Sequence, residues 1–360
     1  MSKKVVVGMS GGVDSSVAAY LLKQQGYEVI GVTMEIWQQE SAQVQEQEGG
    51  CCGFSAVQDA RRVCHALGIS HYVMNFRDIF REKVINYFIE EYGRGRTPNP
   101  CIACNRYVKW EALLERSLEI GADFIATGHY ARIKKLENGR YAVCRSASAG
   151  KDQTYALYNL TQKQLSHTLM PVGEYDKAEI RKIAAEQGLL VADKPDSQEI
   201  CFVPDNNYHR FLEEETGKKA VSGSFVDKEG NVLGVHQGIS HYTIGQRKGL
   251  GLAMGHPVFV TELRPESNEV VIGEPEDVFG DTLTASCLHC MAVDKFTVGQ
   301  RMMAKIRYAG RGQLCQVEKL EQDRITVKFI QPVRAITPGQ AAVFYEDDVV
   351  LGGAVIVGGQ

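Results

Sequence analysis

The first 130 residues alternate short apolar segments with amphipathic ones, and this order constrains the fold more than any other feature. Four segments rich in Val, Ile and other apolar residues have the length of buried strands: residues 5–8, 27–34, 71–75 and 123–127. The segments between them carry apolar side chains at helical spacing: residues 17–22, 57–67, 79–92 and 111–120. This alternation favours an α/β fold, with a parallel sheet covered by helices on both faces.

The pattern changes after residue 130. Residues 131–145 are typical of a hairpin that turns at Asn138-Gly139, and residues 177–187 and 208–215 of two helices. From about residue 220 the chain is β-rich and punctuated by turn signals, which favours small barrels or sandwiches. We therefore predict a catalytic domain followed by a small central β-rich domain and a C-terminal β-barrel domain: residues 1–205, 206–276 and 277–360.

Composition excludes several classes of protein. The net charge of −4 argues against a nucleic-acid binder driven by overall charge, so any such partner needs local basic patches. No apolar run reaches the roughly 18 residues of a membrane helix, which predicts a protein without membrane association. Ten cysteines in 360 residues are too few for a disulfide scaffold and indicate a reducing, cytoplasmic location.

The segment Ser10–Ser15 reads SGGVDS and lies between the first predicted strand and the first predicted helix. Two glycines allow a tight turn, and the amino end of the following helix attracts an anion. The loop lacks the Lys of a Walker A motif, and Asp14 would repel a bare phosphate unless Mg²⁺ lay between them. A plain glycine-rich turn capped by Asp14 or Ser15 is the alternative interpretation.

In this setting the SGGVDS loop resembles the pyrophosphate loop of the ATP pyrophosphatases, which adenylate a substrate and release pyrophosphate. The resemblance implies a fold similar to the adenine-nucleotide alpha hydrolases, with ATP and Mg²⁺ as cofactors. The loop alone does not choose among the synthetases and tRNA-modifying enzymes of that group.

Cysteines in two motifs suggest sulfur chemistry. Residues 97–105 read TPNPCIACN, which places Cys104 one helical turn after Cys101 if a helix begins there. A thiol near the amino end of a helix is more readily ionised than an ordinary one. Cys201 lies far away in the sequence, within DSQEICFVP. Two such cysteines suit a persulfide relay, in which one carries the terminal sulfur and the other attacks or resolves.

Three other interpretations of the cysteines stay open. Cys101 and Cys104 could join Cys287 and Cys290 in a Cys₄ zinc site, which has the right local spacing. Cys101, Cys104 and Cys201 could hold an iron–sulfur cluster, although three ligands are one fewer than usual. The remaining cysteines are expected to be inert core residues: Cys64, Cys144, Cys315, Cys287 and Cys290. The sequence indicates no role for Cys51 or Cys52.

Seven motifs in order make the whole chain resemble the tRNA-specific 2-thiouridylase family, which replaces O2 of the wobble uridine by sulfur: GMSGGVDSSVAAYLL, TPNPCIACNRYVKW, ATGHYAR, KDQTYAL, DSQEICFVP, HYTIGQRKGLG and AKIRYAGRG. The resemblance implies a tRNA-uridine 2-sulfurtransferase with tRNA and a persulfide sulfur-carrier protein as partners. Cys104 would be the catalytic nucleophile and Cys201 the persulfide carrier, ending as a disulfide that a reductant opens.

The resemblance also implies three sets of binding residues. ATP would be bound by Gly8, Met9, Ser10, Gly11, Gly12, Val13, Asp14, Ser15, Met34 and Gly128. The target base would be met by Asn99, Pro100 and Cys101. The tRNA would be contacted by His129, Lys151, Asp152, Gln153, Arg307, Tyr308 and Gln340. Many members carry Asp where this chain has Cys101, so any acid–base role of that position stays open here.

Two basic segments could supply the local patches that tRNA needs. Residues 131–153 hold six basic and two acidic residues, and residues 301–311 hold four basic residues and no acidic one. A solvated charged surface is the ordinary explanation of such runs. Beside the reactive cysteines, contact with phosphates becomes the better hypothesis, and Tyr308 could stack on a base.

Two rival functions explain part of the sequence. A small-molecule ligase of the ATP-pyrophosphatase type would use the loop but gives Cys104 and Cys201 no task. A zinc-stapled RNA-binding protein would use the cysteines but leaves the loop without ATP turnover.

Overall fold

The computed structural model describes residues 2–37, 54–195, 200–203 and 205–359. Contacts divide the chain into two compact units. Unit 1 comprises residues 1–85, 100–206 and 348–350, and unit 2 comprises residues 86–99, 207–347 and 351–360. Cys51 and Cys52 lie outside the described residues. No helix of the described part is long and apolar enough to cross a bilayer.

Unit 1 is built on a five-stranded sheet in the order β3-β2-β1-β4-β7, and the paired strands run parallel. Its strands are β1 (Lys4–Gly8), β2 (Glu28–Glu35), β3 (Ser70–Asn75), β4 (Phe124–Ala126) and β7 (Thr168–Leu169). The central strand β1 is buried on both faces at Val5, Val6 and Val7, as expected for a parallel sheet between helical layers. The predicted α/β class is confirmed.

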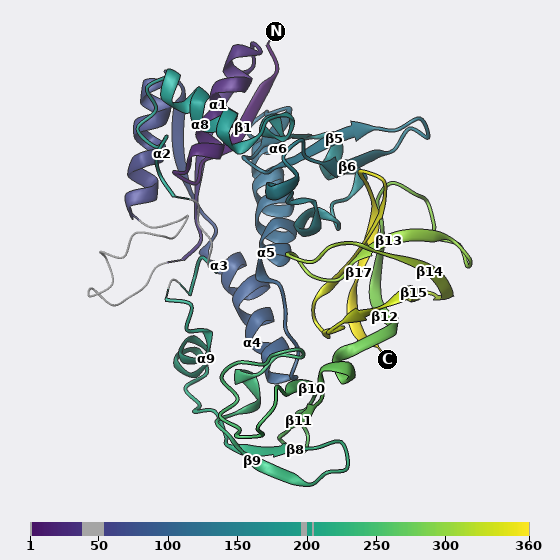
Figure 1. The fold of residues 1–360 in the computed structure, drawn as a ribbon. Coiled ribbons are helices and arrows are strands. Elements are labelled where there is room, and N and C mark those ends of the chain that lie inside the picture. The colour runs from purple at the N-terminus through teal and green to yellow at the C-terminus, as the bar shows by residue number, and fades with distance from the viewer. Residues whose placement is uncertain (1, 38–53, 196–199, 204, 360) are drawn as a thin grey trace. The chain divides into compact units, whose positions relative to one another are not determined.

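Helices pack against both faces of this sheet (Figure 1). One apolar cluster joins β1 to α1 (Val13–Gln24), α2 (Phe54–Ala66) and α8 (Lys177–Glu186) through side chains such as Val17, Val63 and Ile180. On the other face, Leu113 Cδ2 lies 3.9 Å from the position that a Cβ on Gly8 would occupy.

The cysteine motif lies on a continuous helical stretch that begins earlier than the sequence predicts. It comprises α5 (Pro100–Ala103), the π-helix η2 (Cys104–Leu113) and α6 (Leu114–Glu119). The expected start at residue 111 is wrong because Pro100 itself occupies the first turn, where its fixed φ and missing N–H are tolerated. Residues 79–92, predicted as one helix, are likewise divided into α3 (Arg77–Phe80), the π-helix η1 (Arg81–Ile85) and α4 (Asn86–Gly93).

The remaining elements of unit 1 surround the predicted hairpin. Strands β5 (Ala131–Lys135) and β6 (Tyr141–Arg145) pair antiparallel and turn near Gly139, which has φ +83°. Short helices follow: η3 (Ala149–Lys151), η4 (Thr154–Leu157), α7 (Gln162–Ser166) and η5 (Pro171–Glu174). The hairpin prediction is confirmed.

Unit 2 contains a small sheet and a barrel, which confirms the expected β-rich character. The small sheet has the order β10-β11-β8-β9, with strands β8 (Gly223–Val226), β9 (Val232–His236), β10 (Phe259–Arg264) and β11 (Glu269–Gly273). Its core includes Phe225, Tyr242 and Val260. Helix α9 (Tyr208–Thr216) precedes this sheet, and η6 (Ile239–His241) follows β9.

The barrel follows η7 (Pro275–Val278). Strands β12, β15, β14, β13, β16 and β17 are neighbours in that order, and β17 also pairs with β12. Their bounds are Phe279–Cys290, Arg324–Arg334, Gln313–Glu321, Arg301–Lys305, Ala341–Glu346 and Val349–Gly359. Because the last strand pairs with the first, the barrel has no open edge between them.

Candidate active site

The SGGVDS loop lies at the carboxyl edge of the parallel sheet, where α/β folds place their ligands. Gly11 has φ +69°, and a Cβ there would lie 2.4 Å from the carbonyl oxygen of Ala56 in α2. Only glycine therefore fits this position. At Gly12 a Cβ would meet nothing closer than Ser10 Oγ at 3.5 Å. The first glycine is required for packing of the loop, whereas the second leaves its backbone open to close approach by a ligand.

Serine side chains hold the loop against the start of α1. The amide of Ser10 donates to Ser15 Oγ at 3.2 Å, and Ser16 Oγ donates to the Gly12 carbonyl at 2.8 Å. The residue at the N-cap of α1 is Gly12, which has no side chain to accept from the first helical amides. The amino end of α1 thus keeps the polarity that attracts an anion.

Gly128 brings the end of β4 against this loop. A Cβ on Gly128 would lie 2.6 Å from the amide nitrogen of Ser15 and 2.7 Å from the carbonyl carbon of Asp14. Met34 lies at the carboxyl end of β2, which pairs with β1. The residues predicted to bind ATP therefore come from the adjacent strands β1 and β2, from the loop that follows β1 and from the segment that follows β4.

Asp14 is held by two residues that sequence reasoning missed. Lys177 Nζ lies 2.8 Å from each carboxylate oxygen, and the Tyr130 hydroxyl donates to Oδ1 at 2.7 Å. A second lysine, Lys194, donates to the Gly11 carbonyl at 3.1 Å and pairs with Asp59 at 2.8 Å. Both lysines lie more than 150 residues along the chain from the loop, so only the fold brings them together with it.

The cysteine helix is anchored immediately after Cys104. Asn105 is buried and donates to the Ala156 carbonyl at 3.0 Å, and Lys109 donates to Asn105 Oδ1 at 2.8 Å. Trp110, also buried, donates to Thr168 Oγ1 at 2.8 Å. Cys104 itself is partly exposed at the point where α5 passes into the π-helix. Such π-helical segments are rare and occur frequently at functional sites.

His129 connects the cysteine helix with the loop. Its ring centroid lies 5.4 Å from that of Trp110, and its Nδ1 is 2.7 Å from Thr127 Oγ1. Burial, together with the nearby Lys109 ammonium, holds the pKa of His129 well below its usual range. A neutral imidazole therefore stands beside Gly128, which touches Asp14 and Ser15.

Cys201 belongs to a short turn in unit 1, in which the Val203 amide donates to the Ile200 carbonyl at 2.8 Å. The next residue, Phe202, is buried, and its ring meets Phe80 of α3 edge-on at a centroid distance of 5.7 Å. Helix α3 in turn packs against η2, which begins at Cys104. The segment bearing Cys201 and the helix bearing Cys104 thus pack on the same element.

The alternative roles predicted for cysteines have different outcomes. The described residues form no group of three or more metal-ligating side chains, so neither the Cys₄ set nor the set of Cys101, Cys104 and Cys201 is gathered. No disulfide joins cysteines in the described ranges.

Of the five cysteines expected in the core, three are buried, and burial raises the pKa of Cys144 to about 11 and of Cys64 and Cys315 to about 12. The prediction was wrong for Cys287, which is exposed, and for Cys290, which is partly exposed, because strand β12 carries them at its irregular end.

Three of the residues predicted to contact tRNA lie in unit 1 beside His129. Gln153 Oε1 accepts from the Tyr130 amide at 2.8 Å, and the Gln153 amide donates back to the Tyr130 carbonyl at 3.0 Å. Thr154 Oγ1 donates to Asp152 Oδ2 at 2.8 Å, and Lys151 is exposed. Among the nearby basic residues, Arg132 and Lys134 pair with Asp348 at 2.8 and 3.2 Å, so they are already neutralised in part.

The other predicted tRNA residues lie in unit 2. Gln340 Nε2 donates to the Thr97 carbonyl at 2.8 Å, which places Gln340 beside the chain that leads to Asn99. Arg307 donates to the Arg334 carbonyl, and the ring of Tyr308 is 45% exposed with Lys305 Nζ 5.6 Å from its centroid. An exposed aromatic ring beside cations suits stacking on an unpaired base.

These features define an α/β nucleotide-binding protein of the HUP class with two appended β-rich domains. The chain matches the family description "tRNA methyl transferase HUP domain" over residues 3–205. The descriptions "tRNA methyl transferase PRC-barrel domain" and "Aminomethyltransferase beta-barrel domain" match residues 209–274 and 281–356.

Full-length relatives make the assignment more specific. The chain is 65% identical to the tRNA-specific 2-thiouridylase MnmA of Lachnoclostridium phytofermentans, with 99% of each chain covered. It is 57% identical to the same-named protein of Clostridium perfringens, with 98% of each covered, and 53% identical to that of Clostridioides difficile, with 99% of this chain and 98% of the relative covered. The chain belongs to the tRNA-specific 2-thiouridylase family of enzymes.

Proposed function

We propose that this enzyme uses ATP to replace O2 of the wobble uridine of tRNA by sulfur, releasing AMP and pyrophosphate. The observation that carries the proposal is the contact series from the loop to the cysteine helix: Gly128 touches Asp14 and Ser15, and His129 next to it meets Trp110. A small-molecule ligase would need only the contact of Gly128 with Asp14 and Ser15, and not the contact of His129 with Trp110. The identity with thiouridylases over the full length supports the same reaction.

ATP binds with its pyrophosphate on the residues of the loop and Gly128. The open backbone at Gly12 and the amino end of α1 provide amides for the phosphate oxygens. Asp14 is the only carboxylate in residues 8–15, and an ammonium already faces it in this structure, so its surroundings fit a cation. Asp14 would hold Mg²⁺, which when bound neutralises charge on the phosphate oxygens.

The base is activated before sulfur arrives. The wobble uridine is extruded toward Asn99, Pro100 and Cys101, because an atom within a stacked loop is poorly accessible. O2 attacks the α-phosphate, a bond to phosphorus forms, and pyrophosphate leaves with the electron pair. The C2–O bond can then break, because AMP is a far better leaving group than an oxide ion. His129, kept neutral by burial, adds no positive charge beside the loop.

Sulfur is transferred from Cys201 as a persulfide charged by a sulfur-carrier protein. The terminal sulfur reaches C2 either directly as hydrosulfide or through Cys104, and AMP departs. Cys104 and Cys201 are left as a disulfide, because the persulfide sulfur takes up two electrons from the thiols. An external thiol reductant then restores both cysteines.

The other residues are proposed in supporting roles. Lys151, Asp152, Gln153, Arg307, Tyr308 and Gln340 contact tRNA, and Met34 lines the ATP site. We place the domain boundaries near residues 205 and 277, and the enzyme in the cytoplasm, where its tRNA substrate is found. An iron–sulfur cluster stays an untested prediction.

One assay tests the reaction. The protein, ATP, Mg²⁺, a persulfide sulfur donor, a thiol reductant and unmodified tRNA are incubated, and nucleosides from the tRNA are analysed by mass spectrometry. We expect 2-thiouridine that depends on both ATP and protein. Pyrophosphate release driven by a small carboxylic acid, without any thiolated nucleoside, would favour the ligase instead. Repeating the assay anaerobically with and without iron tests the cluster.

A further inference from the structure

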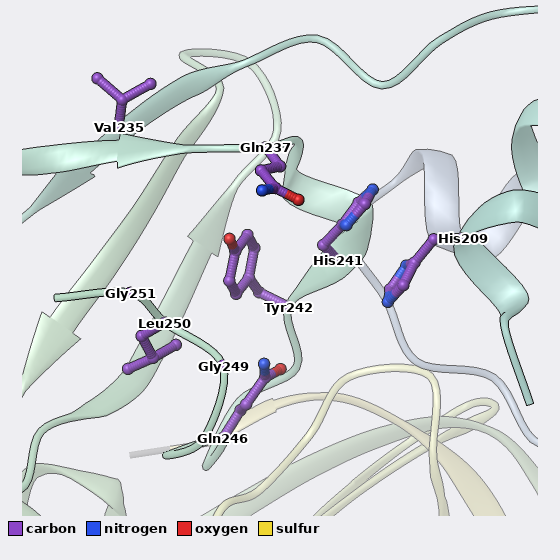
Figure 2. Close-up of a pocket in the computed structure, with 9 residues that line it drawn as sticks. All are labelled: His209, Val235, Gln237, His241, Tyr242, Gln246, Gly249, Leu250 and Gly251. Atoms are coloured by element: carbon purple, nitrogen blue, oxygen red, sulfur yellow. The ribbon is translucent and has the colours of Figure 1, made fainter.

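A cavity of about 370 Å³ lies in the central β-rich region of unit 2, apart from all residues assigned above. Figure 2 shows its lining: His209 from α9, His241 and Tyr242 at the end of η6, and the turn that carries Gln246 and Leu250. The volume is of the size that binds small organic groups. Because the lining combines flat rings, amides and two apolar side chains, it suits a flat heteroaromatic ring with a polar edge.

Two histidines give this cavity unsatisfied hydrogen-bonding groups. The rings of His209 and His241 are stacked at a centroid distance of 3.9 Å and an angle of 7°. His209 Nδ1 and His241 Nε2 are buried, and neither atom has a hydrogen-bond partner among the described residues, although the His209 ring also interacts with the Ser240 backbone. Burial lowers the pKa of both histidines, to about 4 for His209, so both imidazoles are neutral at physiological pH. A ligand that bonds to these nitrogens would satisfy groups that the protein leaves unmet.

The Gln246 side chain fixes the turn that follows Tyr242. Gln246 Oε1 accepts from the Thr243 amide at 3.0 Å, and Gln246 Nε2 donates to the Lys248 carbonyl at 3.1 Å. Gly249 and Gly251 both have positive φ, at +76° and +69°, so the turn needs residues without a Cβ. The amide of Gln246 therefore shapes the cavity, and recognition falls to the two imidazoles.

Cations border the same cavity. Arg247 and Lys248 lie in sequence between two residues of its lining, Gln246 and Gly249, and both are exposed. Neither makes an ion pair within the part of the chain that the structure describes. One carboxylate, Glu213, acts on both histidines and accepts from the Ala220 amide at 2.9 Å. Two cations against this one carboxylate leave the border with a net positive charge, which suits a phosphate attached to the ring in the cavity.

We propose that this cavity is a second RNA subsite, which takes one unpaired nucleotide of the tRNA outside the reacting uridine. The base presents its polar edge to His209 and His241, and its phosphate meets Arg247 and Lys248. Unstacked bases held by rings and polar groups are the usual targets of sequence-specific RNA recognition. The inference rests on the proposed function, because it takes tRNA as the substrate.

The test measures the affinity of the full-length protein for unmodified tRNA at several salt concentrations. His241→Phe keeps a flat ring against His209 and removes the nitrogens, so we expect affinity about tenfold weaker. The double variant R247A/K248A changes only exposed residues and should weaken tRNA binding. The slope of log affinity against log salt concentration should fall by about one to two, roughly one for each lost phosphate contact. The charge-matched control K218A/K219A lies outside the lining and should bind as the wild type does.

Three outcomes would overturn the subsite. Unchanged tRNA affinity in both test variants would reject it, while 2-thiouridine formation by the wild type would leave the proposed function standing. Binding of AMP that H241F abolishes, with tRNA affinity unchanged, would make the cavity a mononucleotide site. A wild-type protein that binds no tRNA would reject both proposals. Crosslinking of tRNA containing 4-thiouridine gives an independent readout, and we expect crosslinked peptides from residues 235–251.

Discussion

The ammonium of Lys177 lies 2.8 Å from both carboxylate oxygens of Asp14, although 163 residues separate the two in sequence. The Lys177 side chain is only 13% exposed, so the pair is shielded from water more than a surface ion pair is. Lys177 is also the first residue of α8, whose N-cap Asp176 fixes the start of the helix through a capping box. The position of this lysine is therefore set by the fold.

We expect Lys177→Met to weaken ATP binding about tenfold, because only Mg²⁺ would then offset the charge of Asp14 beside the phosphates. Calorimetric titration with ATP measures the affinity. Lys182→Met on the same helix removes an exposed lysine paired with Glu186 and should leave ATP affinity unchanged. Asp14→Ala should block release of pyrophosphate. Equal ATP affinities for Lys177→Met and the wild type would remove this lysine from the site.

Gly128→Ala tests the close approach of β4 to the loop. The added methyl would lie within 3 Å of backbone atoms of Asp14 and Ser15, which cannot move without displacing the start of α1. We expect a loss of about 1–3 kcal/mol in stability together with impaired ATP binding. Gly150→Ala is the matched control, since a Cβ there meets nothing within 4 Å. If the two variants have the same stability and ATP affinity, the close packing at Gly128 has no functional importance.

The sequence predicted elements whose signals are local. The strand–loop–helix around SGGVDS, the hairpin with its turn at Asn138-Gly139, and the β-rich second half all follow from periodicity and turn chemistry. The helix that carries the cysteines begins at Pro100 rather than at residue 111, because the fixed φ and missing N–H of proline are tolerated at the first helical position. No simple sequence pattern marks the π-helical segments η1 and η2.

The partners of the site could not be predicted in the same way. Lys177, Tyr130 and Lys194 reach the loop only through tertiary packing, and although Tyr130 stands in the ATGHYAR motif, nothing in that motif points to Asp14. The same holds for the stacked pair of His209 and His241, which come from different elements of unit 2. Motifs predict the residues that are expected to contact ligands, whereas the residues that hold the loop in place are seen only in the structure.

The two cysteines assigned to sulfur transfer should be separable from ATP binding. Cys104→Ser and Cys201→Ser are each expected to abolish 2-thiouridine formation, because serine cannot form a persulfide or a disulfide. ATP affinity should stay within about twofold of the wild type, since neither residue belongs to the loop. Cys287→Ser, at an exposed position, is the control. Thiolation that persists in either variant would exclude that cysteine from the mechanism.

Substitutions at Cys101 distinguish two possible roles of this residue, an acid–base group and a metal ligand. It is exposed in the first turn of α5, and the described residues do not gather it with Cys104 and Cys201 into a metal site. Family members with Asp at this position lead us to expect that Cys101→Asp retains thiolation, with Cys101→Ala as the comparison. Activity lost in Cys101→Asp and dependent on iron in the wild type would instead support a cluster. Iron content and nucleoside analysis of the same preparations decide between these results.

The stacked histidines predict an acid sensitivity of unit 2. The pKa of His209 is lowered from 6.5 to about 4 by burial and by His241, against the opposing effects of Glu213 and the Ser240 backbone. The unfolded chain therefore binds more protons at acid pH than the folded one does, and the stabilisation present above pH 6.5 is lost as the pH falls toward 4.

His209→Gln should reduce the pH dependence of the free energy of unfolding by about 1 kcal/mol between roughly pH 7 and pH 5. The partial exposure of the His209 ring keeps this effect small. Chemical unfolding at the two pH values measures the difference, and NMR titration of the imidazole measures the pKa directly. A His209 that titrates near 6.5, or a variant whose unfolding midpoint shifts with pH as much as that of the wild type, would contradict the burial argument.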